Sequence, residues 1–356
     1  MSLPQNDSSV VRVLVVDDSA FMRFTISKYF SESPFLQVVG TARDGQEALE
    51  LIPKLNPDVV TLDVEMPRLD GLSTLREIMT HYPRPVVMLS SLTKEGAVET
   101  IQALTLGAVD FIAKPDLKAN MGSILQEVVS KIIRASKAKV TALSRRVPVE
   151  TKITANRDGK KKQIRPMLNN DRLVIIGSST GGPRALNTVI PLLPADLQAA
   201  VMIIQHMPAG FTRSLAERLD NTSQLVVKEA EPGDALMVGR ILLAPGGFHM
   251  VFDKEGRVAL NQNAPVHGVR PSVDVTMLSI VPQFGKRTIG AVLTGMGNDG
   301  ASGASLIHGL GGWVIAESEE TSIVWGMPRS VVEAGAANEV LPLEQVANGI
   351  VQAARR

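Results

Sequence analysis

Three side chains in the C-terminal half of the sequence could together carry out nucleophilic hydrolysis. Ser179 lies in the segment "VIIGSSTGGP" (174–183), His206 follows the apolar segment "AAVMIIQ", and Asp299 lies in "GMGNDGA". An imidazole can accept the proton of a serine hydroxyl, and a carboxylate can orient that imidazole and stabilise its charged form. Because the three residues are far apart in the sequence, this chemistry requires a fold that brings them together.

Each of these residues also has a purely structural explanation. A serine in such a turn commonly caps a helix, and an aspartate before glycine commonly forms a turn. The segment "GSSTGG" is not a phosphate-binding P-loop, because no lysine follows its second glycine, and it is not a G-x-S-x-G nucleophile elbow. His249 in "APGGFHM" and His267 in "NAPVHGVRPSVD" are alternative bases, and no His/Asp/Glu cluster of this C-terminal half has the ligand spacing of a metal site.

A second set of side chains, in the N-terminal part, suits phosphoryl chemistry. Asp17 and Asp18 follow the apolar segment "VRVLVV", and Asp63 follows "DVVTL". Crowded carboxylates repel one another unless a cation or proton joins them, and hard oxygen ligands at a partly open site suit Mg²⁺. Ser90 and Lys114 end two further apolar segments, where a hydroxyl and an ammonium group would stabilise a phosphoryl group on Asp63.

The elements that must position these residues alternate between strands and helices in both halves of the chain. Apolar runs separated by helical spacing predict an α/β fold, with a parallel sheet covered by helices and ligands beyond the carboxyl ends of the strands. The N-terminal runs, which predict a five-stranded parallel sheet, are 11–16, 35–40, 58–62, 85–90 and 109–113. The C-terminal runs are 172–177, 199–205, 287–295 and 312–317, with β-hairpins expected within 231–262.

Charge and composition divide the chain into three segments. Residues 134–172 hold twelve Lys/Arg and three Asp/Glu, whereas residues 1–133 carry a net charge of −5. We interpret 1–133 and 172–356 as domains and 134–171 as a basic linker. The chain has no cysteine, no apolar run of membrane-spanning length and no N-terminal secretory pattern, which favours a cytoplasmic protein without membrane insertion.

The N-terminal motifs "VVDDSAFMR", "TLDVEMPRLDG", "VVMLSS" and "FIAKP" resemble the receiver domain of two-component response regulators, which has a flavodoxin-like fold. The resemblance implies that Asp63 is the phospho-acceptor and that a histidine kinase is the phosphodonor. It also implies that Asp18, Asp63 and the backbone carbonyl of Glu65 hold Mg²⁺ with Asp17 nearby. Ser90 and Lys114 would be the switch hydroxyl and lysine, and Phe111 would be the aromatic residue of the last strand.

The C-terminal motifs "IIGSSTGGP", "QHMPAGFTRSLAERL", "RPSVDV", "VLTGMGNDGA" and "WGMPRSVVEAGAA" resemble the chemotaxis protein-glutamate methylesterase family, a doubly wound α/β fold. The resemblance implies that Ser179 rather than Ser178 is the nucleophile, that His206 is the general base and that Asp299 orients it. It also implies that the Met296 backbone N–H helps to bind the oxyanion. Ester hydrolysis would then need no cofactor.

The joined resemblances imply phosphorylation-regulated hydrolysis of glutamate γ-methyl esters on bacterial chemoreceptors, with release of methanol, and glutamine deamidation by the same nucleophile remains open. We expect the unphosphorylated receiver to hinder access to Ser179. The alternative is a phosphorylation switch joined to a non-catalytic α/β interaction module. A DNA-binding output domain is disfavoured, because the C-terminal part carries net negative charge and no basic recognition helix.

Overall fold

The structure, a computed structural model, describes residues 10–91, 93–114, 121–138, 140 and 163–356, without the side chains of residues 94 and 121–127. The chain forms two compact units, Met1–Val147 and Pro148–Arg356, and each is considered by itself. Their border lies within the basic segment 134–171, and residues 141–162 of that segment are outside the described residues.

The first unit contains a five-stranded parallel sheet with the order β2-β1-β3-β4-β5, which confirms the predicted fold. Every residue of β3 and β4 is buried, and strands covered on both faces read as nearly unbroken apolar runs. The order reverses between β1 and β3, where this fold class places its ligands. The strands are β1 (Val11–Val16), β2 (Leu36–Ala42), β3 (Val59–Asp63), β4 (Val86–Ser90) and β5 (Asp110–Ala113).

Four of the five described helices of the first unit begin at side chains that satisfy backbone donors of the first turn. Ser19, Asp44, Asp70 and Thr93 each accept a backbone N–H of the helix that follows. These caps end the loops that leave the carboxyl edge of the sheet. The helices are α1 (Ala20–Glu32), α2 (Gly45–Leu55), α3 (Gly71–His81), α4 (Lys94–Leu106) and α5 (Met121–Ser136).

The second unit contains a seven-stranded parallel sheet with the order β16-β15-β14-β7-β8-β11-β9, which confirms a doubly wound α/β fold. β7, the first of these strands in the chain, lies between β14 and β8, so the strand order reverses beside it. The strands are β7 (Arg172–Ser178), β8 (Ala199–Gln205), β9 (Val226–Glu229), β11 (Arg240–Leu243), β14 (Thr288–Val292), β15 (Trp313–Glu317) and β16 (Glu339–Leu341).

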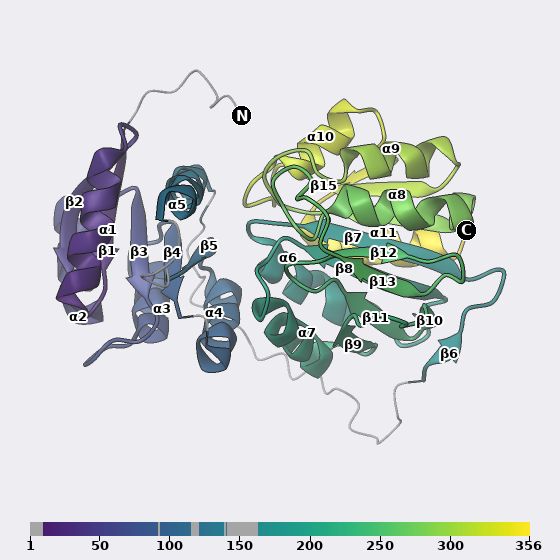
Figure 1. Ribbon diagram of the computed structural model, residues 1–356, viewed down its shortest axis with the longest axis horizontal. Coiled ribbons are helices and arrows are strands. Elements are labelled where there is room, and N and C mark those ends of the chain that lie inside the picture. Colours follow the sequence, from purple (N-terminus) through teal and green to yellow (C-terminus); the bar gives the residue numbers. More distant parts are fainter. Residues whose placement is uncertain (1–9, 92, 115–120, 139, 141–162) are drawn as a thin grey trace. The chain divides into compact units, whose positions relative to one another are not determined.

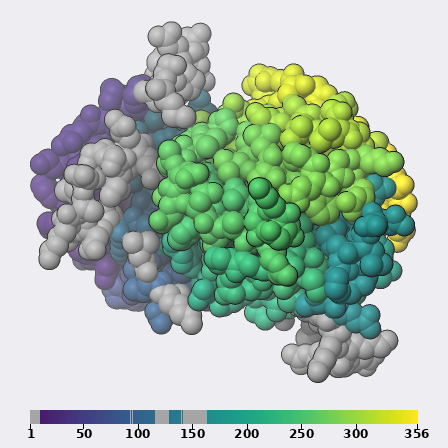
Figure 2. Space-filling view, turned by 45° about the vertical axis from the view of Figure 1, so that its right-hand side comes forward, coloured from purple at the N-terminus to yellow at the C-terminus, as the bar shows by residue number. Residues whose placement is uncertain are grey.

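Helices cover both faces of this second sheet. α8, α9 and α10 lie on one side, and α6 and α7 lie on the other (Figure 1). Segments far apart in the sequence, coloured teal, green and yellow, lie against one another on the face shown in Figure 2. The helices are α6 (Gly182–Val189), α7 (Phe211–Thr222), α8 (Val273–Phe284), α9 (Ala301–Gly309), α10 (Met327–Glu333) and α11 (Leu343–Ala354), with short 3₁₀ turns at Ile190–Leu192 and Gly285–Arg287.

The region 231–262 differs in part from the hairpins that the sequence predicts. One hairpin is present, formed by β12 (His249–Phe252) and β13 (Val258–Asn261). β11 instead joins the main sheet in parallel with β8 and β9, because its apolar residues fill the core beside β8. β10 (Met237–Val238) pairs with β6 (Arg165–Pro166), so part of the segment interpreted as a linker belongs to the second unit. None of the described helices is long and apolar enough to span a bilayer.

Candidate active site

The sheet of the second unit brings the predicted catalytic residues to one edge. Ser179 follows β7, His206 follows β8, and the loop that contains Asp299 follows β14. These strands are parallel neighbours, and in the register of β7 and β8 Ser178 lies opposite Gln205. The His206 backbone N–H also donates to the Ser178 carbonyl at 3.1 Å, so Ser179 and His206 continue adjacent strand ends.

His206 and Asp299 form a direct pair. The distance from His206 Nε2 to Asp299 Oδ2 is 2.7 Å, and the two side chains are only 7% and 2% exposed. Since an ionised carboxylate only accepts hydrogen bonds, Nε2 carries a proton in this pair. In neutral His206 this leaves Nδ1 as the ring nitrogen that can accept a proton.

The N-terminus of α8 holds the Asp299 carboxylate in place. Ser272 Oγ and the Asp274 N–H donate to Oδ1 at 2.8 and 2.9 Å, and the Val273 N–H donates to Oδ2 at 2.7 Å. Burial raises the pKa of Asp299, but the hydrogen bond and charge of His206 and these backbone N–H groups outweigh it and lower the pKa below 3.8. Asp299 is therefore held as an anion beside the imidazole.

The two neighbouring serines have different environments. Ser178 is fully buried, and its hydroxyl donates to Gln205 Oε1 at 2.7 Å. Gln205 in turn donates through Nε2 to the carbonyls of Ser179 and His206 at 2.9 and 3.0 Å. Ser179 is half-buried, and its hydroxyl makes no hydrogen bond to any residue that the structure describes, His206 included. The Ser178 hydroxyl is thus occupied by a structural bond, whereas the Ser179 hydroxyl is available.

The loop that contains Met296 passes close to Ser179. The Thr294 carbonyl accepts the Ser179 N–H at 3.0 Å, and the Gly295 carbonyl accepts N–H groups from Gly326 and Met327 at 3.0 and 2.7 Å. A Cβ on Gly295 would lie 2.8 Å from Ser179 Cβ, so only glycine permits this approach. Met296 is 40% exposed, and its N–H meets no acceptor within the described part of the chain.

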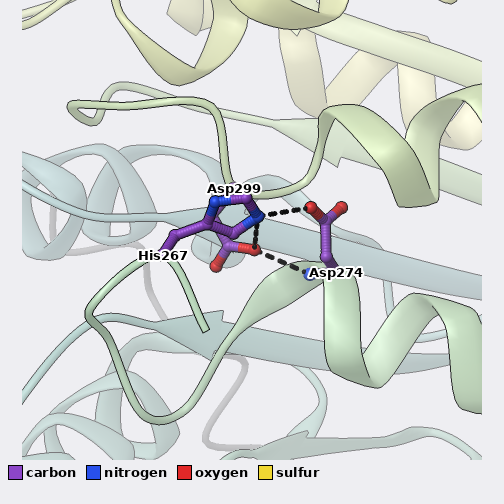
Figure 3. A group of neighbouring side chains, drawn as sticks. All are labelled: His267, Asp274 and Asp299. Atoms are coloured by element: carbon purple, nitrogen blue, oxygen red, sulfur yellow. Dashed lines mark hydrogen bonds and ion pairs between the residues drawn. The ribbon is translucent and has the colours of Figure 1, made fainter. Parts of the chain in front are cut away.

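The two alternative histidines lie in different surroundings. His249 is 1% exposed, and its Nε2 lies 3.1 Å from the Ala264 carbonyl, which makes it a buried structural residue. His267 Nε2 lies 3.0 Å from Asp274 Oδ2 and 4.0 Å from Asp299 Oδ1, as Figure 3 shows.

His267, Asp274 and Asp299 are near enough to one another to hold a metal ion, a grouping that residue spacing does not reveal. Their oxygens are already engaged, however. The other carboxylate oxygen of Asp274 accepts the Gly303 N–H at 2.8 Å, and both oxygens of Asp299 accept from α8 or His206. The cluster is therefore a hydrogen-bond network that orders the start of α8.

In the first unit, the structure brings Asp17, Asp63 and Lys114 together. Lys114 Nζ lies 2.6 Å from Asp63 Oδ2 and 3.1 Å from Asp17 Oδ2. Burial raises the pKa of Asp63 to about 6; Lys114 opposes this shift and Asp17 adds to it. Both aspartates are nearly inaccessible, at 3% and 0% exposure, so their charges depend on the lysine or on a bound cation.

The carboxylates of the first unit fit a hard divalent cation. Oxygens of Asp17, Asp18 and Asp63 lie within 4.8 Å of one another, and the buried Asp17 Oδ2 has Lys114 Nζ, at 3.1 Å, as its partner among the described residues. Asp18 and Glu65 also line an open acidic cavity of about 500 Å³. The all-oxygen donor set and the open side suit Mg²⁺, which retains water ligands.

The Ser90 hydroxyl makes no hydrogen bond to Asp63. The Ser90 side chain is fully buried, and its hydroxyl accepts from Thr100 Oγ1 at 2.6 Å and donates toward the Gly96 carbonyl at 3.2 Å. The hydroxyl is therefore directed toward α4. Phe111 is buried on β5 with Lys131 Nζ 5.2 Å from its ring centre.

Sequence reasoning did not find several residues that support the site. The sequence assigns no role to Gln205 or Ser272, although each lies within a quoted motif, Gln205 in "QHMPAGFTRSLAERL" and Ser272 in "RPSVDV". Gln205 directly precedes His206, and Ser272 occupies the capping position before the apolar run of α8. Their partners, Ser178 and Asp299, come from other parts of the chain, so spacing alone could not reveal the bonds.

Comparison with known proteins agrees with both halves of the structure. Residues 13–126 match the response regulator receiver domain, and residues 174–350 match the CheB methylesterase family. A protein-glutamate methylesterase/protein-glutamine glutaminase of Symbiobacterium thermophilum is 53% identical over an alignment of 354 positions, which covers 96% of this chain and 97% of the relative. A protein of the same name from Pyrococcus horikoshii is 47% identical, and its alignment covers 96% of this chain and 93% of the relative.

A solved structure extends this comparison to the second unit. The crystal structure of the Thermotoga maritima CheB methylesterase catalytic domain is 45% identical, with a TM-score of 0.50. The match covers 51% of this chain and 98% of the chain in that crystal structure. The chain therefore belongs to the family of protein-glutamate methylesterases that carry an N-terminal response-regulator receiver domain.

Proposed function

We propose that this protein hydrolyses glutamate γ-methyl esters on bacterial chemoreceptors, releasing methanol, and that phosphorylation of its receiver domain regulates the reaction. Family membership supports the activity. The observation that supports this site is the buried His206–Asp299 pair at the end of the strand next to that of Ser179. The Ser179 hydroxyl makes no hydrogen bond to a described residue. The non-catalytic alternative gives no reason to bury such a pair.

The proposed reaction begins with attack of Ser179 Oγ on the ester carbonyl carbon. His206 accepts the serine proton at Nδ1, and Asp299 stabilises the resulting imidazolium through Nε2. The Met296 N–H donates to the oxyanion of the tetrahedral intermediate. Transfer of the proton to the methoxy oxygen releases methanol and leaves an acyl-enzyme. His206 then activates a water molecule, which releases glutamate and restores the serine.

The same acyl-enzyme would form from a receptor glutamine, with ammonia as the leaving group in place of methanol. The names of the relatives from Symbiobacterium thermophilum and Pyrococcus horikoshii include protein-glutamine glutaminase. We therefore include glutamine deamidation in the proposed function. Both reactions use the same nucleophile and the same base, so a variant that lacks the Ser179 hydroxyl should lose both.

The receiver domain would accept a phosphoryl group on Asp63 from a histidine kinase. Asp18, Asp63 and the Glu65 carbonyl would hold Mg²⁺ with Asp17 beside them, and the cation would neutralise charge on the phosphoryl oxygens. Lys114 already lies 2.6 Å from the Asp63 carboxylate and would pair with the phosphoryl group. Ser90 would have to leave its bond with Thr100 to reach that group.

Regulation would follow from a change in the receiver's preferred state. We propose that the unphosphorylated receiver hinders the access of chemoreceptors to Ser179. Phosphorylation of Asp63 would favour a state of the receiver that leaves Ser179 accessible. A phosphoryl group can do this only by stabilising one state more than the other. The rearrangement of Ser90 away from α4 is one local change that phosphorylation would favour.

The direct test measures methanol release from methylated receptor by the wild-type protein and by Ser179→Ala. Release by the wild type and its loss in the variant are expected. Labelling by a fluorophosphonate, mapped by mass spectrometry, checks the nucleophile independently and should occur at Ser179. Equal methanol release by both proteins would refute the assignment of the nucleophile, and absence of release from the wild type would refute the proposed function.

A further inference from the structure

A second acidic side chain lies buried close to the candidate site. Glu317 is the last residue of β15 and is 0% exposed. Its Oε2 accepts the Thr294 N–H at 2.7 Å, and its Oε1 accepts from the Thr321 hydroxyl at 3.0 Å. Both of these partners are uncharged, whereas Asp63 pairs with the Lys114 ammonium group.

Burial of this carboxylate is costly, so its retention at this position needs a reason. Burial raises the pKa of Glu317, and the nearby Glu344 acts in the same direction. The Thr294 N–H and the Thr321 hydroxyl oppose the shift but do not cancel it. An apolar residue would fill the space without this cost. The position of Glu317 therefore points to a role in holding its partners.

Two hydrogen bonds connect Glu317 with the backbone of Ser179. Thr294 donates its N–H to Glu317, and the carbonyl of Thr294 accepts the Ser179 N–H at 3.0 Å. The Thr294 hydroxyl also donates to the Thr180 carbonyl at 3.0 Å. The backbone at the nucleophile is thus anchored to a residue that Glu317 holds.

Glu317 also anchors the segment that supports the Met296 loop. Its backbone carbonyl accepts Trp325 Nε1–H at 3.2 Å. On either side of Trp325, the Val324 carbonyl accepts the Gly295 N–H at 3.0 Å, and Gly326 donates to the Gly295 carbonyl at 3.0 Å. Both neighbours of Trp325 therefore bond Gly295, and the Trp325 indole between them is held by the backbone of Glu317.

We propose that Glu317 is a positioning residue for ester hydrolysis: its carboxylate fixes Thr294 and so sets the geometry between the Ser179 hydroxyl and the Met296 N–H. Glu317 does not touch the substrate. The inference rests on the proposed function, since it assumes that Ser179 is the nucleophile. A positioning role differs from a purely structural role, because it predicts a slower reaction of Ser179 in variants of Glu317 that are correctly folded.

The test compares Glu317→Leu with Glu317→Gln. Leucine removes the acceptor and leaves the buried Thr294 N–H unpaired, whereas the glutamine oxygen can still accept that bond. The matched control is Asp171→Leu, which removes a buried carboxylate bonded to Arg165 at the opposite end of β7. Urea unfolding followed by the fluorescence of the protein's two tryptophans, both in the second unit, reports the folded fraction of each variant.

The readouts are the rate and the final extent of fluorophosphonate labelling at Ser179, with kcat and KM for methanol release. We expect Glu317→Leu to reach full labelling but at a rate about ten- to a hundredfold lower, with a similar loss in kcat and little change in KM. Glu317→Gln should keep at least about a third of the wild-type rate. Asp171→Leu should unfold at lower urea and label within about threefold of the wild type.

A labelling rate equal to that of the wild type in folded Glu317→Leu would overturn the inference. An equal loss of labelling rate in Glu317→Gln and Glu317→Leu would also overturn it, because glutamine retains the acceptor. If Glu317→Leu does not fold, Thr321→Val provides the test. This change removes one partner of Glu317 and should slow labelling about threefold, and an unchanged rate would contradict the proposal. A wild-type protein that is not labelled at Ser179 would instead refute the proposed function itself.

Discussion

At the scale of single residues, the site depends on which polar groups are already bonded. Ser178 and Ser179 are chemically identical and adjacent, yet Gln205 Oε1 engages only the Ser178 hydroxyl. A hydroxyl held by a buried acceptor cannot easily approach a substrate. The same logic applies to Asp299, whose oxygens are committed to α8 and His206, and which therefore orients the imidazole rather than binding a ligand.

The first prediction separates the two serines. Ser179→Ala should lower kcat by at least about a thousandfold, because the nucleophile is lost. Ser178→Ala should keep kcat within about tenfold of the wild type but lower the free energy of unfolding by about 1–3 kcal/mol, because Gln205 Oε1 loses a buried donor. Methanol release and urea unfolding measure these effects. The opposite pattern would assign the nucleophile to Ser178.

The second prediction concerns the stability of the receiver domain in the absence of divalent metal. The folded-state pKa of Asp63 is raised from 3.8 to about 6. The contribution of Asp63 to the free energy of unfolding is therefore complete below about pH 3.8 and is lost as the pH rises through about 6. Asp63→Asn removes this dependence. We expect the variant to gain stability relative to the wild type from about pH 4 to pH 6, by at most about 3 kcal/mol, and to keep that gain above pH 6.

Hydrogen exchange of peptides from β1 and β3 measures this effect, because both tryptophans lie in the second unit and do not report on the receiver. Lys114 retains Asp17 as a partner in the variant. A difference between variant and wild type that stays constant from pH 4 to pH 8 would contradict the assigned pKa shift.

At the scale of elements, strand ends and one helix N-terminus assemble the site. Parallel strands β8, β7 and β14 present their carboxyl ends at one edge, and α8 directs its first N–H groups at Asp299. The N-terminus of a helix carries partial positive charge and free N–H donors, so it stabilises an anion there. The local geometry of α8 thus helps to keep the Asp299 carboxylate charged.

The third prediction tests this role of α8. Ser272 both donates to Asp299 Oδ1 and caps the helix by accepting the Val275 N–H at 3.3 Å. Ser272→Ala should lower kcat about tenfold and the free energy of unfolding by about 1 kcal/mol. The matched control is Ser279→Ala on the same helix, whose hydroxyl bonds only the Thr276 carbonyl. Equal kcat values for the two variants would contradict the prediction.

At the scale of the whole molecule, two α/β units in one chain join a phosphorylation site to a candidate hydrolytic site. Each unit uses the same physical rule, in which ligands gather where the strand order reverses. The receiver places Asp17 and Asp63 at that point, and the second unit places Ser179 there. Fusion raises the effective concentration of one unit around the other, which makes control within one chain feasible.

The fourth prediction tests this control. A small phosphodonor such as acetyl phosphate, added with Mg²⁺, should raise kcat/KM for methanol release about tenfold in the wild type. Asp63→Asn should keep the basal rate and lose the stimulation, because the phospho-acceptor is absent. Removal of Mg²⁺ with EDTA should abolish stimulation in the wild type without changing the basal rate. Full stimulation of Asp63→Asn would refute regulation through this residue.

The sequence predicts the periodic elements and the residues at their ends, because apolar runs and helix caps are local signals. It therefore predicted the five strands of the first sheet and four of the seven strands of the second, without β9, β11 and β16, and placed Ser179, His206 and Asp299 after strands of the second. It did not predict that β11 joins the main sheet, since a four-residue strand looks alike in a hairpin and in a sheet. Which polar groups bond to one another follows from the three-dimensional fold. Gln205 engages Ser178, α8 holds Asp299 and Glu317 holds Thr294 because folding brings together donors and acceptors that are distant in the sequence.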